Sequence, residues 1–392
     1  MNFTNPYTSF GAADPFPATL PINSPPPGPS APISNNQSWL TYDPFHGFQD
    51  PLTYAWNLAL EQQVTRSLSA RAAYVATHGS HQWVPFELNP AIANTRLYYQ
   101  TGCSSSSVVD STGKSCYPGT ITAANTGGNM NYNSLQLSAE QRVRYGLTLL
   151  ANLTWSKSLD NQPWNQASTS IGNNNSYVFP YYMPNFKSLD YGPSDFNHKI
   201  VSAVSYVYQE PKVLNDAPYA VRYLVNNWET SGLFQFRSGD PLTIWSSNNN
   251  VSGSEQDRDR AVQTGAPYAS TACGASTKCK SWLNQSSFVN PTYAGSMVAS
   301  SYGSVKKGSF VGPRYVDWDA SIVRKFPVYR DRANLQFKAE YFNLMNHTNL
   351  GDPGTTVGGS LGKITSTNPQ NWSGTYTTND PRIAQFSLKL VF

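Results

Sequence analysis

Charged residues are scarce in this chain of 392 residues. Asp, Glu, Lys and Arg make up 13% of it, whereas a soluble globular domain has roughly 25%. The formal net charge is only +4, and no basic stripe runs along the sequence. Because proteins that bind nucleic acid need clustered Lys and Arg to contact phosphates, the composition argues against nucleic acid as a partner.

Long apolar runs are absent as well. A transmembrane helix needs about 20 predominantly apolar residues, and no such run occurs. Amphipathic runs with a period of 3.6 residues are nearly absent too. A transmembrane β-strand needs only about 9–11 residues and can be polar on one face. The sequence therefore predicts an all-β protein and is compatible with β-strands that cross a membrane.

Cysteine is rare, with four residues that form two local pairs, Cys103 with Cys116 and Cys273 with Cys279. More than one connectivity is compatible with four cysteines. We expect the local pairing, which gives two disulfides in an oxidising compartment. Neither pair has zinc-type spacing or a nearby His, so no metal site is predicted there.

Alternation of apolar and polar residues is abundant, and it recurs in segments long enough to cross a membrane. In residues 147–157, for example, Leu149, Leu153 and Trp155 alternate with polar residues. The predicted strands are 53–61, 68–77, 133–143, 147–157, 198–209, 227–238, 315–326, 333–343 and the C-terminal residues.

The two faces of these segments differ in a way that favours a barrel over a soluble sandwich. The polar faces carry charges of both signs in mid-strand, as at Lys338 and Glu340, which a water-filled lumen allows. The apolar faces carry Trp, Tyr or Phe towards their ends, as an interfacial girdle does. The predicted architecture is an antiparallel transmembrane β-barrel with lipid as a partner.

The connections between these segments alternate between long and short, with 210–226 as an intermediate exception. Outer-membrane barrels have short periplasmic turns and long extracellular loops, so all long connections are expected outside the cell. Residues 1–52, which contain a Pro-rich run at 21–29, are predicted to be an extracellular irregular segment. Residues 53–392 are predicted to be the barrel.

The chain ends in a strand with one apolar face. Ala384, Phe386, Leu388, Leu390 and Phe392 share this face, and the chain stops on the aromatic residue. Bacterial outer-membrane barrels commonly close in this way. We therefore predict that Phe386, Leu388, Leu390 and Phe392 form an assembly signal for the barrel assembly machinery.

Patterns that could carry catalysis are weak. The run 358–362 matches G-x-S-x-G, but no helix is predicted after it, as a nucleophile elbow requires. Asp190 and Asp195 could be paired carboxylates for sugar hydrolysis, although the sequence does not show their separation. We predict no catalytic residue and no enzymatic activity.

Patterns that could bind a metal or cofactor are equally weak. His78, His81 and His347 form no H-x-x-x-H or H-E-x-x-H pattern. The charge run 255–260 lacks the glycine and glutamate positions of an EF-hand loop and is expected to be solvated. No metal site and no cofactor are predicted.

Several longer strings resemble one known family. They are YAWNLALEQQ at 54–63, LSARAAYV at 68–75, WSKSLD at 155–160, DYGPSDFNH at 190–198, RSGDPLT at 237–243 and FNLMNHTN at 342–349. Together with the closing strand, they resemble the Oar-like TonB-dependent transporter barrel over roughly residues 50–392. The resemblance implies a barrel of about 22 strands with an internal plug in the bacterial outer membrane. It also implies energised uptake of an unidentified small molecule, oligosaccharide or peptide, driven by TonB.

The plug, the TonB-contacting segment and a signal peptide are not evident in the sequence, and an odd strand number does not suit a bacterial barrel. We therefore expect this chain to be the C-terminal part of such a transporter. A secreted soluble β-protein that binds or cleaves polysaccharide, and a porin or adhesin barrel, are the alternatives.

Overall fold

The structure, a computed structural model, describes residues 39–42, 49–87, 91–92, 95–96, 121–161, 191–210, 218, 221, 223, 225–247, 260–269, 280–292, 303–329, 333–367 and 381–391. No helix in these ranges is long and apolar enough to cross a membrane.

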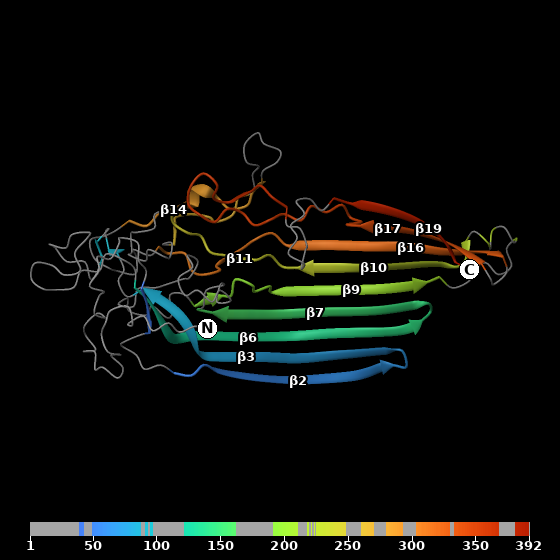
Figure 1. The fold of residues 1–392 in the computed structure, drawn as a ribbon, viewed down its shortest axis with the longest axis horizontal. Helices are drawn as coiled ribbons and strands as arrows, with labels where there is room; N and C mark the ends of the chain where they lie inside the picture. The colour runs from blue at the N-terminus through green and yellow to red at the C-terminus, as the bar shows by residue number, and fades with distance from the viewer. Residues whose placement is uncertain are drawn as a thin grey trace, which may run out of the picture.

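One large antiparallel sheet dominates the described residues (Figure 1). Its path runs through nine strands, each hydrogen-bonded to its neighbours along the chain in the order β19-β17-β16-β10-β9-β7-β6-β3-β2. In sequence order they are β2 (Leu52–Thr65), β3 (Leu68–Glu87), β6 (Ile121–Arg144), β7 (Leu147–Asp160), β9 (Ile200–Gln209), β10 (Trp228–Arg237), β16 (Tyr315–Tyr329), β17 (Ala333–Phe342) and β19 (Ile383–Val391). All nine predicted strands are confirmed. Short strands β1 (Trp39–Tyr42) and β8 (Gly192–Pro193) pair with β6 and β7.

The pairing register joins the predicted apolar rows into one continuous face. Leu58 is opposite Tyr74, Tyr74 is opposite Leu135, and Leu135 is opposite Trp155. Directly opposite residues project from the same face of a sheet. Leu58 is 76% exposed and Trp155 is 55% exposed, so this face, here called the outer face, presents large apolar side chains outward. Such a surface needs lipid or a partner to cover it.

The opposite face, here called the lumen face, is polar. The hydroxyls of Ser231 and Ser321 are 2.8 Å apart across β10 and β16. On β17, Lys338 Nζ lies 2.7 Å from Glu340 Oε1, so charges of both signs sit in mid-strand as expected. The sheet is therefore amphipathic over its whole width.

The outer apolar row has a defined height. In β7 it runs from Leu147 to Trp155, close to the about 9–11 residues of a transmembrane strand. Beyond this level the outer face turns polar: Tyr74 donates a hydrogen bond to Asn133 Oδ1 (2.6 Å), and His78 Nδ1 lies 2.8 Å from Asn131 Oδ1. The aromatic residues thus lie at the border between an apolar band and a polar rim.

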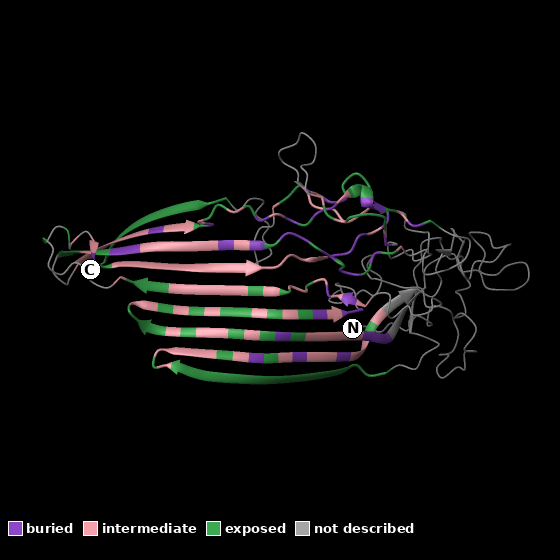
Figure 2. Cartoon of the chain, turned by 180° about the vertical axis from the view of Figure 1, so that it is seen from behind, coloured by how far each residue is buried: buried purple, intermediate pink, exposed green. Residues whose placement is uncertain are grey.

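The sheet is open in the described residues. β2 and β19 stand at its two ends, and every residue of β19 is exposed (Figure 2). β2 begins at Leu52, close to the predicted boundary between residues 1–52 and 53–392. Most of residues 1–52 lie outside the described ranges, so that division stays a prediction.

The connection between β9 and β10 is the one that departs from the alternation of long and short connections. Part of it lies against the side chain of Arg324 on the outer face. Arg324 pairs with Trp228 in the register and is only 1% exposed. Its guanidinium carbon lies 5.1 Å from the centre of the Trp228 ring, 4.6 Å from Phe326 and 6.0 Å from Tyr223. Its Nη1 donates to the carbonyl oxygen of Asn226. Tyr223 and Asn226 belong to this connection, which therefore shields a charge that a tight turn would leave facing lipid.

The longest connections are not simple loops. Residues from 238–314 and 343–382 pair in three small sheets: β11 (Pro241–Leu242) with β15 (Phe310–Val311), β12 (Val262–Gln263) with β14 (Phe288–Val289), and β13 (Lys280–Ser281) with β18 (Lys363–Ile364). A 3₁₀ helix, η2, covers Gln285–Ser287, and β4 (Ala91–Ile92) pairs with β5 (Thr95–Arg96). The small sheets enclose a core of their own, formed by Leu242, Ile244, Ala261, Leu283, Phe288, Val305, Phe310 and Leu361. We call this unit the loop core.

Arg260, at the end of the charge run 255–260, was expected to be solvated. It is instead 5% exposed and lies 5.8 Å from the centre of the Trp245 ring. The expectation was wrong for this residue because it belongs to a strand bridge with Trp245 beside the loop core. The rest of the run lies outside the described residues.

Candidate functional site

The strings that carry the family resemblance meet at one end of the sheet. WSKSLD ends β7, DYGPSDFNH leads into β9, RSGDPLT follows β10 and FNLMNHTN follows β17. All four therefore lie on the side of the long connections, where the loop core also lies (Figure 1). We call the polar contacts that these strings make at this end of the sheet, with one another and with neighbouring segments, the rim cluster.

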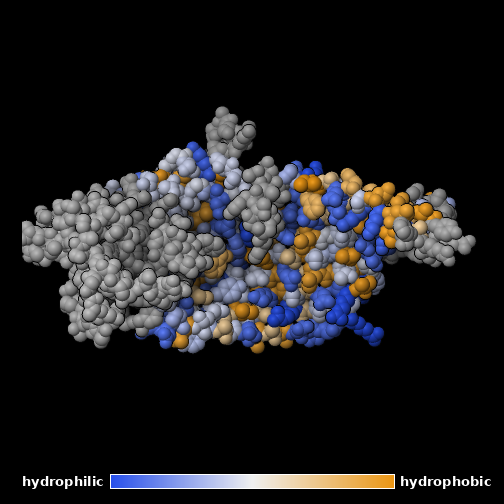
Figure 3. All heavy atoms as spheres, viewed as in Figure 1, coloured by the Kyte–Doolittle hydropathy of each residue, from blue (hydrophilic) through white to orange (hydrophobic). Residues whose placement is uncertain are grey.

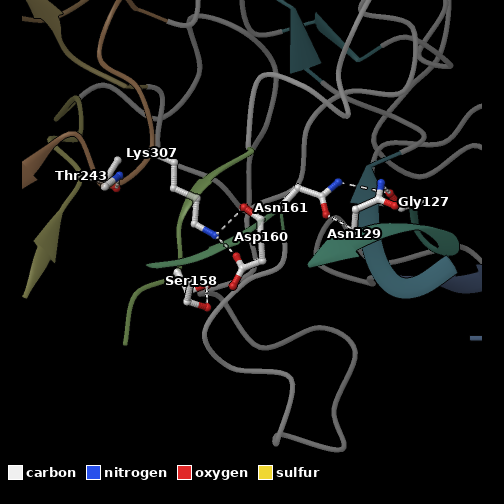
Figure 4. Close-up of polar contacts among 9 residues, drawn as sticks. Gly127, Asn129, Ser158, Asp160, Asn161, Thr243 and Lys307 are labelled. Carbon is white, nitrogen blue, oxygen red and sulfur yellow. Dashed lines mark hydrogen bonds and ion pairs between the residues drawn. The ribbon is translucent and has the colours of Figure 1, made fainter. Parts of the chain in front are cut away.

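A buried ion pair ties the loop core to β7. Lys307 Nζ, with a fully buried side chain, bonds to Asp160 Oδ1, and the Asp160 carboxylate is 9% exposed (Figure 4). The next residue, Gly308, donates its N–H to Thr243 Oγ1 at 2.8 Å. Gly192 packs so closely on Lys307 that a Cβ there would lie 2.5 Å from the Lys307 carbonyl oxygen.

Neighbouring polar groups extend this contact along β7. The Ser158 and Ser194 hydroxyls are 2.8 Å apart in a buried position, and Ser158 N–H donates to Asn197 Oδ1 at 2.7 Å. On the other side, Asn161 Nδ2 donates to Gly127 O (3.2 Å) and its Oδ1 accepts from Asn129 N–H (2.6 Å; Figure 4). The two asparagine side chains thus supply partners to backbone groups where the strands end.

A histidine joins β9 to the segment after β10. His198 Nδ1 lies 3.1 Å from Ser238 O, and Nε2 lies 3.4 Å from Asp240 Oδ1. Burial and the positive charge of Arg237 lower the pKa of His198, outweighing Asp240 and the Ser238 carbonyl, which raise it. His198 is therefore neutral at neutral pH.

Two carboxyl groups from different connections meet next to His198. Asp352, which follows β17, is hydrogen-bonded to Asp240, which follows β10. Burial, followed by the charge and hydrogen bond of Asp240, raises the pKa of Asp352 to about 6, although Arg237 opposes the shift. Gly312 allows this approach, since a Cβ there would lie 2.5 Å from Asp352 Oδ1. The pair shares a proton below that pH.

The string after β17 forms a closed asparagine turn. Asn343, at φ 49°, accepts the His347 N–H through Oδ1 and donates through Nδ2 to the His347 carbonyl, both at 2.9 Å. His347 Nδ1 lies 3.1 Å from Asn349 Oδ1, which also accepts the Val316 N–H at 2.9 Å. These hydrogen bonds give His347 a structural role in the turn.

The other sequence candidates are not brought together. Ser360 of the G-x-S-x-G run lies in a turn that leads into β18, and residues 361–367 contain no helix, so a nucleophile elbow is not formed. The run is also more ordered than a flexible loop, because Leu361 is buried in the loop core. His78 is paired with Asn131. Asp195 is described, but Asp190 lies outside the described residues.

The predicted disulfides and part of the assembly signal stay predictions. Cys103, Cys116, Cys273, Cys279 and Phe392 lie outside the described residues. Phe386, Leu388 and Leu390 share the outer face of β19, opposite Ala339, Phe337 and Leu335 of β17. In the described part of the chain, no group of three or more His, Cys, Asp or Glu side chains could hold a metal ion.

Comparison with known proteins identifies the family. Residues 1–385 match the family model described as "Outer membrane beta barrel domain". The chain belongs to this family. It is an all-β outer-membrane protein, which excludes the secreted soluble alternative. From the general arrangement of outer-membrane barrels, we expect the long-connection end of the sheet to be extracellular and the short-turn end to be periplasmic.

Two solved structures are similar. The outer membrane transporter YddB from Escherichia coli is 13% identical, with a TM-score of 0.41, over 91% of this chain and 34% of that chain. The FrpB iron transporter from Neisseria meningitidis (F3-3 variant) is 12% identical, with a TM-score of 0.34, over 90% of this chain and 32% of that chain. The chain thus spans about a third of these transporters. No curated protein matches.

Proposed function

We propose that this outer-membrane barrel chain is the C-terminal part of an Oar-like TonB-dependent receptor that takes up a ligand across the outer membrane. The observation that carries the proposal is the rim cluster. Four of the strings that resemble this family form the contacts that hold the long connections on the barrel wall. A porin or adhesin barrel does not account for these strings.

The two faces of the sheet and the loop core have different roles in this proposal. The outer face contacts outer-membrane lipid, the lumen face lines a polar passage, and the loop core presents a folded surface to the outside. We propose that this surface and the lumen bind an oligosaccharide, a peptide or another small molecule. The plug and the TonB contact belong to other parts of the full-length receptor.

Several further features belong to this proposal. We propose no catalytic residue and no cofactor for this chain. Residues 1–52 form an extracellular segment, the two local cysteine pairs form disulfides, and the closing strand with Phe392 is read by the barrel assembly machinery. The hydrogen-bonded pair Asp240 and Asp352 does not suit sugar hydrolysis, because its carboxyls are closer than the about 5–10 Å that this reaction needs.

Growth experiments test the proposal. The source bacterium is compared with a strain that lacks the full-length gene, on oligosaccharides and peptides as sole carbon source. We expect loss of growth on at least one of them, and the same loss in a strain that lacks TonB. Growth that depends on the gene but is independent of TonB contradicts energised uptake and favours the porin alternative.

A further inference from the structure

Two periplasmic turns combine arginines with exposed apolar residues. Residues 66–67 join β2 to β3, and residues 145–146 join β6 to β7. Arg66, Arg142 and Arg144 are exposed there. The exposed fractions are 56% for Val64, 72% for Val143 and 78% for Tyr145. The corresponding corner of the surface is hydrophilic at its tip and lies at the ends of these strands (Figure 3).

The depth of the turns in the membrane follows from the register. Leu147 and Leu68, the first residues after the two turns, already belong to the outer apolar rows. The turns therefore lie directly at the periplasmic edge of the apolar band, which is the depth of the lipid headgroups. Val64 and Val143 lie beside the turns, where the register shifts between Gln63 and Thr65 and between Gln141 and Arg144, and both side chains are exposed.

The turns are ordered by their own hydrogen bonds. Thr65 Oγ1 accepts the N–H groups of Ser67 (3.3 Å) and Leu68 (3.1 Å). The N–H of Arg142 donates to Ser67 O at 2.7 Å, which joins the two turns. Tyr145 and Gly146 have φ angles of 51° and 81°, as a type I′ turn requires. Gly146 O also accepts the N–H of Gln209 at 2.8 Å.

The arginines near the two turns differ in their partners. Arg142 Nε lies 3.1 Å from Glu140 Oε1, so part of its charge is compensated. The guanidinium carbon of Arg144 lies 5.0 Å from the centre of the Tyr145 ring, and Nη2 lies 3.4 Å from its hydroxyl. Arg144 is thus held over an aromatic ring that is itself exposed at the depth of the headgroups.

We propose that these two turns form a binding site for anionic glycerophospholipids of the periplasmic leaflet. Arg66 and Arg144 contact the lipid phosphate, as charge complementarity at this depth favours. Tyr145 packs against the glycerol region, and Val64 and Val143 contact the upper acyl carbons. This site does not depend on the transported ligand or on TonB.

Native mass spectrometry of the full-length protein, purified in detergent, tests the site with two probes, phosphatidylglycerol and phosphatidylcholine. We expect the protein to retain phosphatidylglycerol preferentially. The double variant Arg66→Gln/Arg144→Gln should weaken its retention by about fivefold for each arginine removed. Arg66→Lys/Arg144→Lys should keep most of the preference, because the lipid surface attracts charge.

The control is Arg71→Gln, which removes an arginine opposite Glu61 on the lumen face of β3. It should leave lipid retention unchanged. Unaltered heat-modifiable migration verifies that each variant is folded. Equal retention of both lipids by the wild type, or full retention by the double glutamine variant, overturns the proposal. Displacement of phosphatidylglycerol by inorganic phosphate also overturns it, since the site then recognises any small anion.

Discussion

Lys307 reaches across 147 positions of sequence to bond Asp160 at the end of β7, and its side chain is fully buried. Lys307→Met removes the ammonium and leaves the Asp160 carboxylate buried without its cation, which typically costs about 3–5 kcal/mol. We expect the loop core to detach from the barrel wall while the strands persist. Hydrogen exchange of residues 303–311 should rise strongly.

The neighbouring Lys306 provides the matched control, because its side chain is exposed. Lys306→Met should leave hydrogen exchange in 303–311 as in the wild type. If Lys307→Met also leaves it unchanged, the ion pair does not hold the loop core.

The nine strands were predictable from sequence, whereas the loop core was not. Alternation over ten or more residues, as in β7 and β16, specifies both a strand and its faces. β11 and β15 have two residues each and show no period. Their core joins Leu242 to Leu361 across most of the C-terminal half of the chain, and no local pattern records such contacts.

The rim cluster was predictable only in part, for a similar reason. The family strings marked residues such as His198 and Asp240, but their contacts depend on the order of the strands. Lys307 and Asp352 lie in no such string. Their contacts depend on which segments the long connections pack against, and a local sequence pattern does not record that. The role of Arg324 was not predictable either. The residue interrupts an apolar row, and its position there is explained only by its contacts with Tyr223 and Asn226 of the β9–β10 connection.

The Asp240 and Asp352 contact should depend on pH. The pKa of Asp352 is raised to about 6 from the ordinary value of 3.8, so the folded state binds this proton more tightly than the unfolded state. The contact is therefore fully stabilising below about pH 4 and weakens as the pH rises through about 6. After correction for the intrinsic rise of amide exchange with pH, the protection of amides near residues 240 and 352 should be lower at pH 7.5 than at pH 5.

Asp352→Asn should remove this dependence, because the amide does not titrate and can still donate a hydrogen bond to Asp240. His198 and Arg237 face the same pair and remain in this variant. A pH dependence that persists in Asp352→Asn would assign the effect to His198 instead.

The Arg324 guanidinium should stabilise the β9–β10 connection. Arg324→Gln removes the stacking on Trp228 and Phe326 and weakens the bond to Asn226 O, with an expected loss of about 1–3 kcal/mol. The urea midpoint of the protein refolded in lipid should fall. Lys325→Gln, on the exposed neighbour, should leave it unchanged. Equal midpoints for both variants would contradict a stabilising role.

The assignment of the two faces can be tested in the middle of β7. Ala151 lies midway along the outer row, whereas Asn152 belongs to the lumen face. Ala151→Arg places a charge in the hydrocarbon core and should cost about 2–4 kcal/mol of stability in lipid. Asn152→Arg places the same charge in the aqueous lumen and should cost far less. The urea midpoint in lipid vesicles measures both. If Asn152→Arg is the more damaging variant, the faces are reversed and the apolar row lines the interior.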